Sequence, residues 1–446
     1  MYIFYDFETS SKELLGQILT YSFILLDNGF IPRKELQGQI RLNRIQLPDI
    51  DAIATNKINV QDLQQNGESE VEAAKKIVRF LNNAVAHADV CFLVGFNSNA
   101  FDLQFLRNLL IRYGINPYFE GKLMNLDVLH YVKHLAFEFP ERFKWHLALN
   151  KDKLPYYSFS LENCALSYEL LHAAQSHDAR ADVLLTLDLV KTLQSQFHFP
   201  FSTFRPTQFP TEKHRVIKQK VSDIPSFGES PKKFVYRYWL ILAASHKDLL
   251  VLDLEKMKQS PAMECLRYIN ANKQFFVAEA LDASETQRWQ PEADRALSQP
   301  QIKSLTLPKY FDLTPKDWDI EYQIHELGFQ RIPALHMLVQ SLLSDPKSYF
   351  GTLKNLLATR NDKKDDYLIQ LYNRVYLNYF PEPPIEHLHR YITPRYITGT
   401  MLRDMTEFVP LSANLRRLEN LPLEDSLMRA LREYYLQFCK RNGVNV

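Results

Sequence analysis

The chain has 446 residues, enough for roughly two to four domains, and its 46% hydrophobic and 24% charged residues are the balance of a globular protein that can bury a core. A formal net charge of +1 excludes a globally basic nucleic-acid-binding protein, so a nucleic acid would have to bind in a local groove. No apolar run is long enough to span a bilayer, and the N-terminus has the pattern of a strand, not of a signal peptide. The cysteines form no CxxC pair, which argues against a zinc ribbon and is typical of a reducing compartment, so we expect a cytoplasmic protein without a membrane partner; they are Cys91, Cys164, Cys265 and Cys439.

Up to about residue 200 the chain mixes strand-like and helix-like patterns, which predicts an α/β unit. Strands are expected over residues 2–7, 19–27, about 36–42 and 90–96. Helices are expected over residues 70–86, 102–113, 126–135, 161–170 and 178–193. An Asp-Asn-Gly turn at 27–29 predicts a hairpin, and the unbroken apolar run at 90–96 indicates a strand buried on both faces.

A Phe- and Pro-rich stretch at 196–210 predicts a domain boundary. It is followed by a basic helix expected over residues 211–220 and by strands over 234–242 and 249–254, mixed with short helices. The last hundred residues or so have a mostly helical pattern, apart from a Pro-rich break at 380–385.

The first chemical motif is the pair Asp6 and Glu8, at the end of the opening strand. Side chains alternate along a strand, so both carboxylates project from one face, about 7 Å apart. Such a pair repels itself unless a cation lies between the two groups, and hard divalent cations prefer oxygen ligands. The motif predicts part of a metal site; the alternative is that the acids only mark the exit of the strand into solvent.

The second motif is Asp102, which follows the buried strand after a short polar turn at 95–101. The turn delivers this carboxylate into the first turn of a helix, at the end of the sheet where ligands of α/β folds bind. The alternative is an ordinary helix N-terminal acid favoured by the helix dipole.

The third motif is His177 with Asp182, at the start of the helix expected from residue 178. Five residues correspond to 500° on a helix, so the two side chains converge only if His177 precedes the helix. Asp178 is a plausible N-cap, which places His177 just outside. There the imidazole could take a proton from an attacking water, although a histidine before a helix is usually incidental.

In this order the three motifs resemble those of the DEDD-type 3′→5′ exonucleases, in the subclass whose third motif supplies a histidine. Within that group the chain is similar to the bacterial exonuclease I family. The similarity extends past the motifs, over residues 95–108, 125–128, 158–163, 176–183, 249–254 and 370–382.

The resemblance implies an RNase H-like nuclease domain over residues 1–201, an SH3-like α+β domain over 202–345 and a helical domain over 346–446. In the family these parts form a positively charged clamp around single-stranded DNA, and the activity is hydrolysis from the 3′ end to 5′-mononucleotides. The implied partners are single-stranded DNA and the acidic, Phe-ended tail of single-stranded-DNA-binding protein. We expect a monomer.

The resemblance also implies the roles of the site residues. Asp6 would bridge two Mg²⁺ ions, with Mn²⁺ as a substitute, and the ions would lie roughly 3.5–4 Å apart. Glu8 and Asp182 would hold the ion that activates water, and Asp102 the second ion. His177 would act as general base, a role typically worth about 10²–10⁴-fold in rate.

Substrate contacts are expected from Thr9, Asn99, Arg107, Lys218 and Lys220. The two lysines belong to a basic cluster interleaved with aromatic residues, a combination that suits single strands; the alternative is a solvated basic helix beside an ordinary strand. One departure from the family is visible: many relatives have a glycine within two residues of Thr9, whereas here two serines and a lysine follow. The fit of the terminal nucleotide is therefore open.

Three other functions remain. A DEDD-type exoribonuclease is usually little more than the nuclease domain, so the long region beyond residue 200 favours a clamp for longer strands. A catalytically silent binding scaffold is disfavoured because all five site residues are present. A proofreading subunit that works only beside a polymerase is less compatible with the long C-terminal region.

Overall fold

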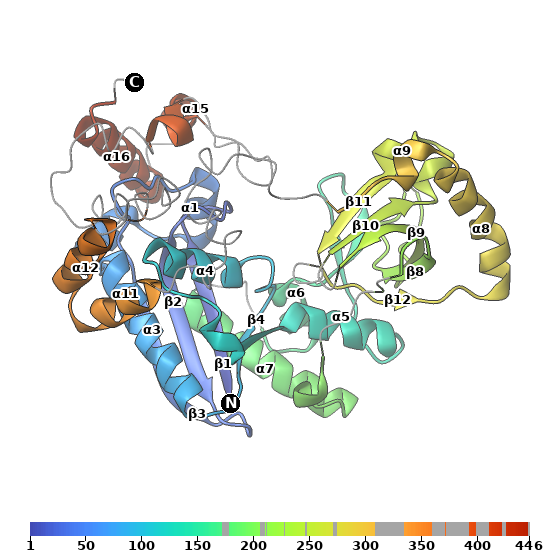
Figure 1. The fold of residues 1–446 in the computed structure, drawn as a ribbon, viewed down its shortest axis with the longest axis horizontal. Helices are drawn as coiled ribbons and strands as arrows, with labels where there is room; N and C mark the ends of the chain where they lie inside the picture. The colour runs from blue at the N-terminus through green and yellow to red at the C-terminus, as the bar shows by residue number, and fades with distance from the viewer. Residues whose placement is uncertain are drawn as a thin grey trace.

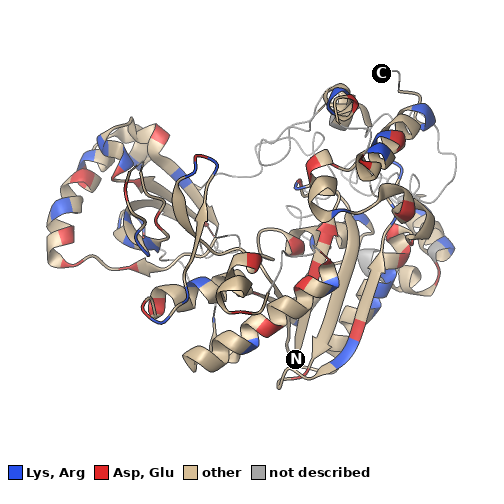
Figure 2. Cartoon of the chain, turned by 180° about the vertical axis from the view of Figure 1, so that it is seen from behind, with Lys and Arg blue, Asp and Glu red and all other residues tan. Residues whose placement is uncertain are grey.

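The computed structural model describes residues 1–171, 178–205, 210, 212–226, 228–245, 248–270, 274–307, 334–358, 371, 392–397, 410–421 and 425–444. Within these ranges, two five-stranded sheets lie in separate parts of the molecule, and helices cover both faces of the first sheet (Figure 1). In the view of Figure 2, basic and acidic residues are interspersed along the elements, in keeping with the near-zero net charge. Within the described ranges, no helix is long and apolar enough to cross a membrane.

The first sheet has the strand order β3-β2-β1-β4-β5. Its strands are β1 (Tyr2–Thr9), β2 (Ile18–Leu26), β3 (Pro32–Gln39), β4 (Cys91–Gly95) and β5 (Leu123–Asp127). β1 pairs antiparallel with β2 and parallel with β4, so the sheet is mixed. The four expected strands are present, although β3 begins earlier than expected, and the α/β prediction is confirmed. β5 was not expected.

Seven helices from the first part of the chain accompany this sheet in the described structure: α1 (Ile50–Asn56), α2 (Val60–Asn66), α3 (Glu70–Ala86), α4 (Asp102–Arg112), α5 (Val128–Glu138), α6 (Leu161–Ser167) and α7 (Ala179–Phe197). The helix expected from residue 126 begins two residues later, because Asp127 ends β5 and caps α5: its Oδ1 accepts the Leu129 N–H at 2.9 Å. A polar side chain at a strand end thus separates two elements that one apolar pattern had merged.

The two faces of β1 decide where the acids point. Ile3, Tyr5 and Phe7 pack into a core shared with α3 and α4, whereas Tyr2 and Phe4 pack into a second core shared with α5 and α7. Since side chains alternate along a strand, the even-numbered residues that follow Phe4 also face the side of α7. β1 is therefore apolar on both faces in its first half. Toward its C-terminal end, carboxylates replace the apolar residues on the face that points toward α7.

The second sheet has the order β11-β10-β9-β8-β12. Its strands are β8 (Val216–Val221), β9 (Val235–Ala244), β10 (Asp248–Asp253), β11 (Leu266–Asn270) and β12 (Ala278–Glu279), followed by helices α8 (Ala283–Leu297) and α9 (Pro300–Lys303). A small hairpin of β6 (His146–Leu149) and β7 (Pro155–Ser158) stands apart from both sheets. The basic helix expected over 211–220 is wrong: its second half belongs to β8, an inner strand between β9 and β12, and the pairing with these partners overrides the local pattern.

The C-terminal helices pack against the first sheet unit (Figure 1). They are α11 (Ala334–Ser344), α12 (Pro346–Ala358), the π-helical turn η8 (Thr393–Ile397), α15 (Leu411–Glu419) and α16 (Ser426–Arg441). α11 and α12 join the core under α3, and α15 and α16 form a third core with α1 and α2. These helices therefore complete the cores of the first unit. The domain limits at 201 and 345 stay predictions, and the break at 380–385 and all of 370–382 except Leu371 lie outside the described residues.

Candidate active site

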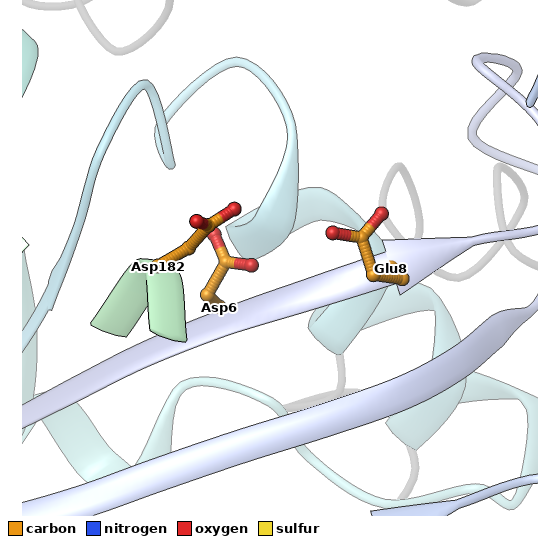
Figure 3. A group of neighbouring side chains, drawn as sticks. All are labelled: Asp6, Glu8 and Asp182. Atoms are coloured by element: carbon orange, nitrogen blue, oxygen red, sulfur yellow. The ribbon is translucent and has the colours of Figure 1, made fainter. Parts of the chain in front are cut away.

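Three carboxylates from distant parts of the chain meet at the end of β1 (Figure 3). Asp6 and Glu8 come from the strand, and Asp182 comes from the first turn of α7. One oxygen from each of the three lies within 4.8 Å of the other two, a spacing that allows all three to bind one metal ion. The convergence follows from the alternation in β1 and from the packing of α7 against that strand. A donor set made only of oxygens fits a hard divalent cation.

Asp102 lies beside this group and is fixed by the strand itself. Its Oδ1 accepts the backbone N–H of Phe7, the residue between the two strand acids, at 3.2 Å. The side chain is 3% exposed and stands in the first turn of α4, as expected. Asp102 is not among the three carboxylates within 4.8 Å, so the structure places it next to the group and not inside it.

Burial and mutual repulsion keep protons on these acids. Burial, reinforced by Asp102, Asp182 and Glu8, raises the pKa of Asp6 well above its ordinary value. Burial and the charge of Asp182 raise the pKa of Glu8 to about 8, and burial raises the pKa of Asp102 to about 7. A divalent cation would relieve the repulsion that these shifts express. The carboxylates thus form a site whose ionised state needs a counter-charge.

Asp127 is a further buried acid near the site, to which the sequence pattern assigned no role. Its Oδ2 accepts the N–H of Asn99 at 3.0 Å, and so holds the turn that leads to Asp102. The amide of Asn125 donates to the Asn99 Oδ1 at 2.9 Å, and the Tyr5 hydroxyl donates to Asn125 at 2.9 Å. Burial raises the pKa of Asp127 to about 6. The signal that could have found it is an acid at the end of a strand parallel to β4.

The start of α7 agrees with the expected position of the third motif. Asp178 is the N-cap, and its Oδ1 accepts the Ala181 N–H at 2.9 Å. Asp182 is therefore in the first helical turn, where it is 5% exposed. His177 lies outside the described residues, so its role stays a prediction.

The substrate-binding residues expected from the sequence fall into two groups. Thr9 and Asn99 are buried next to the acids, and the Thr9 hydroxyl donates to the Ser11 carbonyl at 2.8 Å. The guanidinium of Arg107, on α4, lies 5.1 Å from the ring centre of Tyr118. Direct contact of these side chains with a substrate stays a prediction.

Lys218 and Lys220 lie on β8, on the second sheet, and both carry carboxylate partners. Lys218 Nζ is 2.8 Å from Glu285, and Lys220 Nζ is 3.2 Å from Glu279. Each ammonium also lies over an aromatic ring of β9 or of the segment leading into it. To bind a phosphate, either lysine would have to exchange its glutamate partner.

Comparison with solved structures reveals the same architecture over the whole chain. The structure superimposes on Escherichia coli exonuclease I in complex with a dT13 oligonucleotide with a TM-score of 0.66 at 18% identity, covering 98% of this chain and 99% of that one. The chain has the exonuclease I fold. A structure described as SSB/exonuclease I in complex with the inhibitor CFAM superimposes with a TM-score of 0.67 at 18% identity, covering 98% and 99%. The resemblance to exonuclease I that the motifs indicated is thereby confirmed at the level of the fold.

A sequence relative with a similar name matches a shorter part of the chain. Exodeoxyribonuclease I of Buchnera aphidicola is 26% identical over 200 residues, which is 44% of this chain and 40% of that protein. The match thus spans well under half of the relative's length. No family model matches the chain.

Proposed function

We propose that this chain is a metal-dependent 3′→5′ exodeoxyribonuclease that hydrolyses single-stranded DNA to 5′-mononucleotides. The observation that carries the proposal is the meeting of Asp6, Glu8 and Asp182 within 4.8 Å at the end of β1. Support comes from the fold shared with an exonuclease I that was solved with a bound oligonucleotide. The exodeoxyribonuclease relative adds support from sequence.

The residues fit divalent cations. Asp6, Glu8 and Asp182 supply oxygen ligands, and Asp102 lies alongside as a fourth acid. We propose that these four acids would hold two Mg²⁺ ions, replaceable by Mn²⁺, and that Asp6, which lies among the other three acids, would be a ligand of both. When bound, the ions would supply Lewis-acid stabilisation of the phosphodiester and a more acidic water.

The protein's own groups would orient the carboxylates and deprotonate the attacking water. The Phe7 N–H fixes the direction of the Asp102 carboxylate, and Asp127 fixes the turn that precedes it. His177, one residue before the cap of α7, is proposed as the general base that takes the proton of the attacking water. Its position in the sequence, directly before Asp178, is what supports this role.

The proposed partners are single-stranded DNA and the acidic tail of single-stranded-DNA-binding protein. The second is supported by the neighbour described as an SSB/exonuclease I structure. A monomer in the cytoplasm is also proposed; four buried, free cysteines are compatible with a reducing compartment.

The test is release of mononucleotides from 3′-labelled single-stranded DNA and from RNA of the same sequence, with Mg²⁺ and with a chelator. We expect faster release from DNA, only with the metal. Asp182→Asn should abolish release, whereas Asp188→Asn, an exposed acid on the same helix, should leave it unchanged. Preference for RNA would overturn the substrate, and binding of DNA without any release would favour the silent scaffold.

A further inference from the structure

The chain leaves the candidate metal ligands through a loop of residues 10–17, called the ligand loop here. It follows Glu8 after a single residue and closes on itself. The Ser10 N–H donates to the Gln17 carbonyl at 2.8 Å, and the Gln17 N–H donates back to the Ser10 hydroxyl at 2.8 Å. Ser10 is fully buried. The side chain of Ser10 therefore helps to close the loop directly after β1.

A second stretch, residues 45–49, holds the ligand loop at two points. The Asp49 N–H donates to the Ser10 carbonyl at 2.7 Å. The side-chain amide of Gln46 donates to the Leu15 carbonyl at 2.8 Å. We call residues 45–49 the bridging segment, because it bonds to the ligand loop on one side and shares a core with the C-terminal helices on the other.

Three tyrosines of the C-terminal helices hold the bridging segment. Tyr434 and Tyr435 are on α16, and Tyr396 is in η8; all three are at most 5% exposed. Each hydroxyl donates to a backbone carbonyl of the bridging segment. Tyr434 donates to Gln46 at 3.2 Å, Tyr435 to Pro48 at 2.7 Å, and Tyr396 to Ile45 at 3.2 Å. Tyr396 also accepts the N–H of Leu47 at 3.2 Å. Figure 1 shows α16 lying over the region of α1, which the bridging segment enters.

We propose that these tyrosines, and Tyr435 in particular, are positioning residues for the carboxylate of Glu8. The hydrogen bonds run from α16 to the bridging segment and from there to the ligand loop, whose Ser10 directly follows Thr9, the last residue of β1. Only the expected loss of catalytic rate rests on the proposed function; the effect of Tyr435 on the ligand loop does not. The inference assigns to the C-terminal helices a role inside the nuclease site, beyond any part they have in holding DNA.

The physical reason is that a strand end is held less firmly than a strand middle. Glu8 pairs with β2 at a point where the register shifts, directly before Thr9. Beyond that point, the hydrogen bonds of the ligand loop determine how far the backbone can move. Because a misplacement of about 1 Å can cost about a hundredfold in rate, freeing this loop should lower the rate of the chemical step more than the affinity for the substrate.

Tyr435→Phe tests the inference, with Tyr131→Phe as the matched control. Each change removes one hydroxyl that donates to one backbone carbonyl, at 2.7 Å for Tyr435 and at 2.6 Å from Tyr131 to Phe199. Tyr131 is on α5 and belongs to the second core, which includes no residue of the ligand loop. Three quantities are measured in the full-length protein: amide hydrogen exchange at Ser10 and Gln17 without metal, Mn²⁺ affinity, and kcat and KM on 3′-labelled single-stranded DNA.

For Tyr435→Phe we expect at least roughly threefold faster exchange, roughly tenfold weaker Mn²⁺ binding and roughly tenfold lower kcat at unchanged KM. Tyr131→Phe should change none of these. The inference is overturned if both variants behave alike, or if Tyr435→Phe lowers only the melting temperature. If the parent protein hydrolyses no DNA, the proposed function fails on its own, and the exchange rates at Ser10 and Gln17 still decide whether Tyr435 holds the loop.

Discussion

Removing divalent cations should make the free energy of unfolding fall as the pH rises from about 4.5 to about 8. Burial and neighbouring acids raise the pKa of Glu8 from 4.5 to about 8 and that of Asp102 from 3.8 to about 7. The folded protein therefore holds these protons more tightly than the unfolded chain. Stability from this source is complete below about pH 4.5 and is lost as the pH rises through the folded-state pKa values.

The size of the fall follows from the shift of Glu8. A difference of one pKa unit corresponds to about 1.4 kcal/mol, so a rise from 4.5 to about 8 corresponds to about 5 kcal/mol in all, most of which is lost between about pH 5 and about pH 8. The shift of Asp102 is not added, because the acids titrate together and the repulsion between them would be counted twice.

The assay is urea unfolding followed by circular dichroism at a series of pH values, in chelator and in saturating Mg²⁺. The fall should appear in chelator and shrink in Mg²⁺, since the cation replaces the protons. Asp182→Asn removes the charge that, after burial, does most to raise the pKa of Glu8, so this variant should show a smaller fall in chelator and should be more stable than the parent at about pH 8. An equally flat profile for parent and variant would refute the assignment of a strained acidic site at the end of β1.

Three further outcomes are expected. Asp102→Asn keeps an oxygen that can accept the backbone N–H now bonded to it, so the fold should persist while kcat falls by at least about a hundredfold; a melting temperature that drops with kcat would point to misfolding instead. Arg112→Ala should lower the free energy of unfolding by about 3–5 kcal/mol in urea titrations, because it leaves the carboxylate of Glu70, now 3.0 Å away and buried, without its counter-charge; a loss below about 1 kcal/mol would contradict this. Glu285→Gln should free Lys218 and tighten binding of single-stranded DNA about threefold, with a steeper salt dependence in fluorescence anisotropy, if that lysine contacts phosphate; unchanged affinity would remove Lys218 from the candidate contacts.

Local patterns were sufficient where one short-range rule decides the structure. The apolar spacing of α3 predicted both ends of that helix, and the cap at Asp178 placed the start of α7 within one residue. The alternation of side chains along β1 is enough to place Asp6 and Glu8 on one face. These predictions hold because each depends on residues only a few positions apart.

Local patterns failed where pairing or packing with distant residues decides. The basic stretch before residue 221 has helical character alone, yet it becomes β8 because β9 and β12 bond to both of its edges. Asp127 carries no motif of its own and acquires a role only because β5 lies parallel to β4 and brings it to the turn before Asp102.

The order and spacing of the acids along the chain are sufficient to predict the proposed metal chemistry, because carboxylates on one strand face and at two helix starts are a property of the sequence. Only the tertiary structure decided that Asp182 lies within 4.8 Å of the strand acids while Asp102 stands just beside them. The same holds for the C-terminal tyrosines, which are separated from the bridging segment by about 350 residues or more and reach it by completing a shared core. Hydrophobic burial, which is indifferent to sequence distance, brings these parts together, and the hydrogen bonds then fix their geometry.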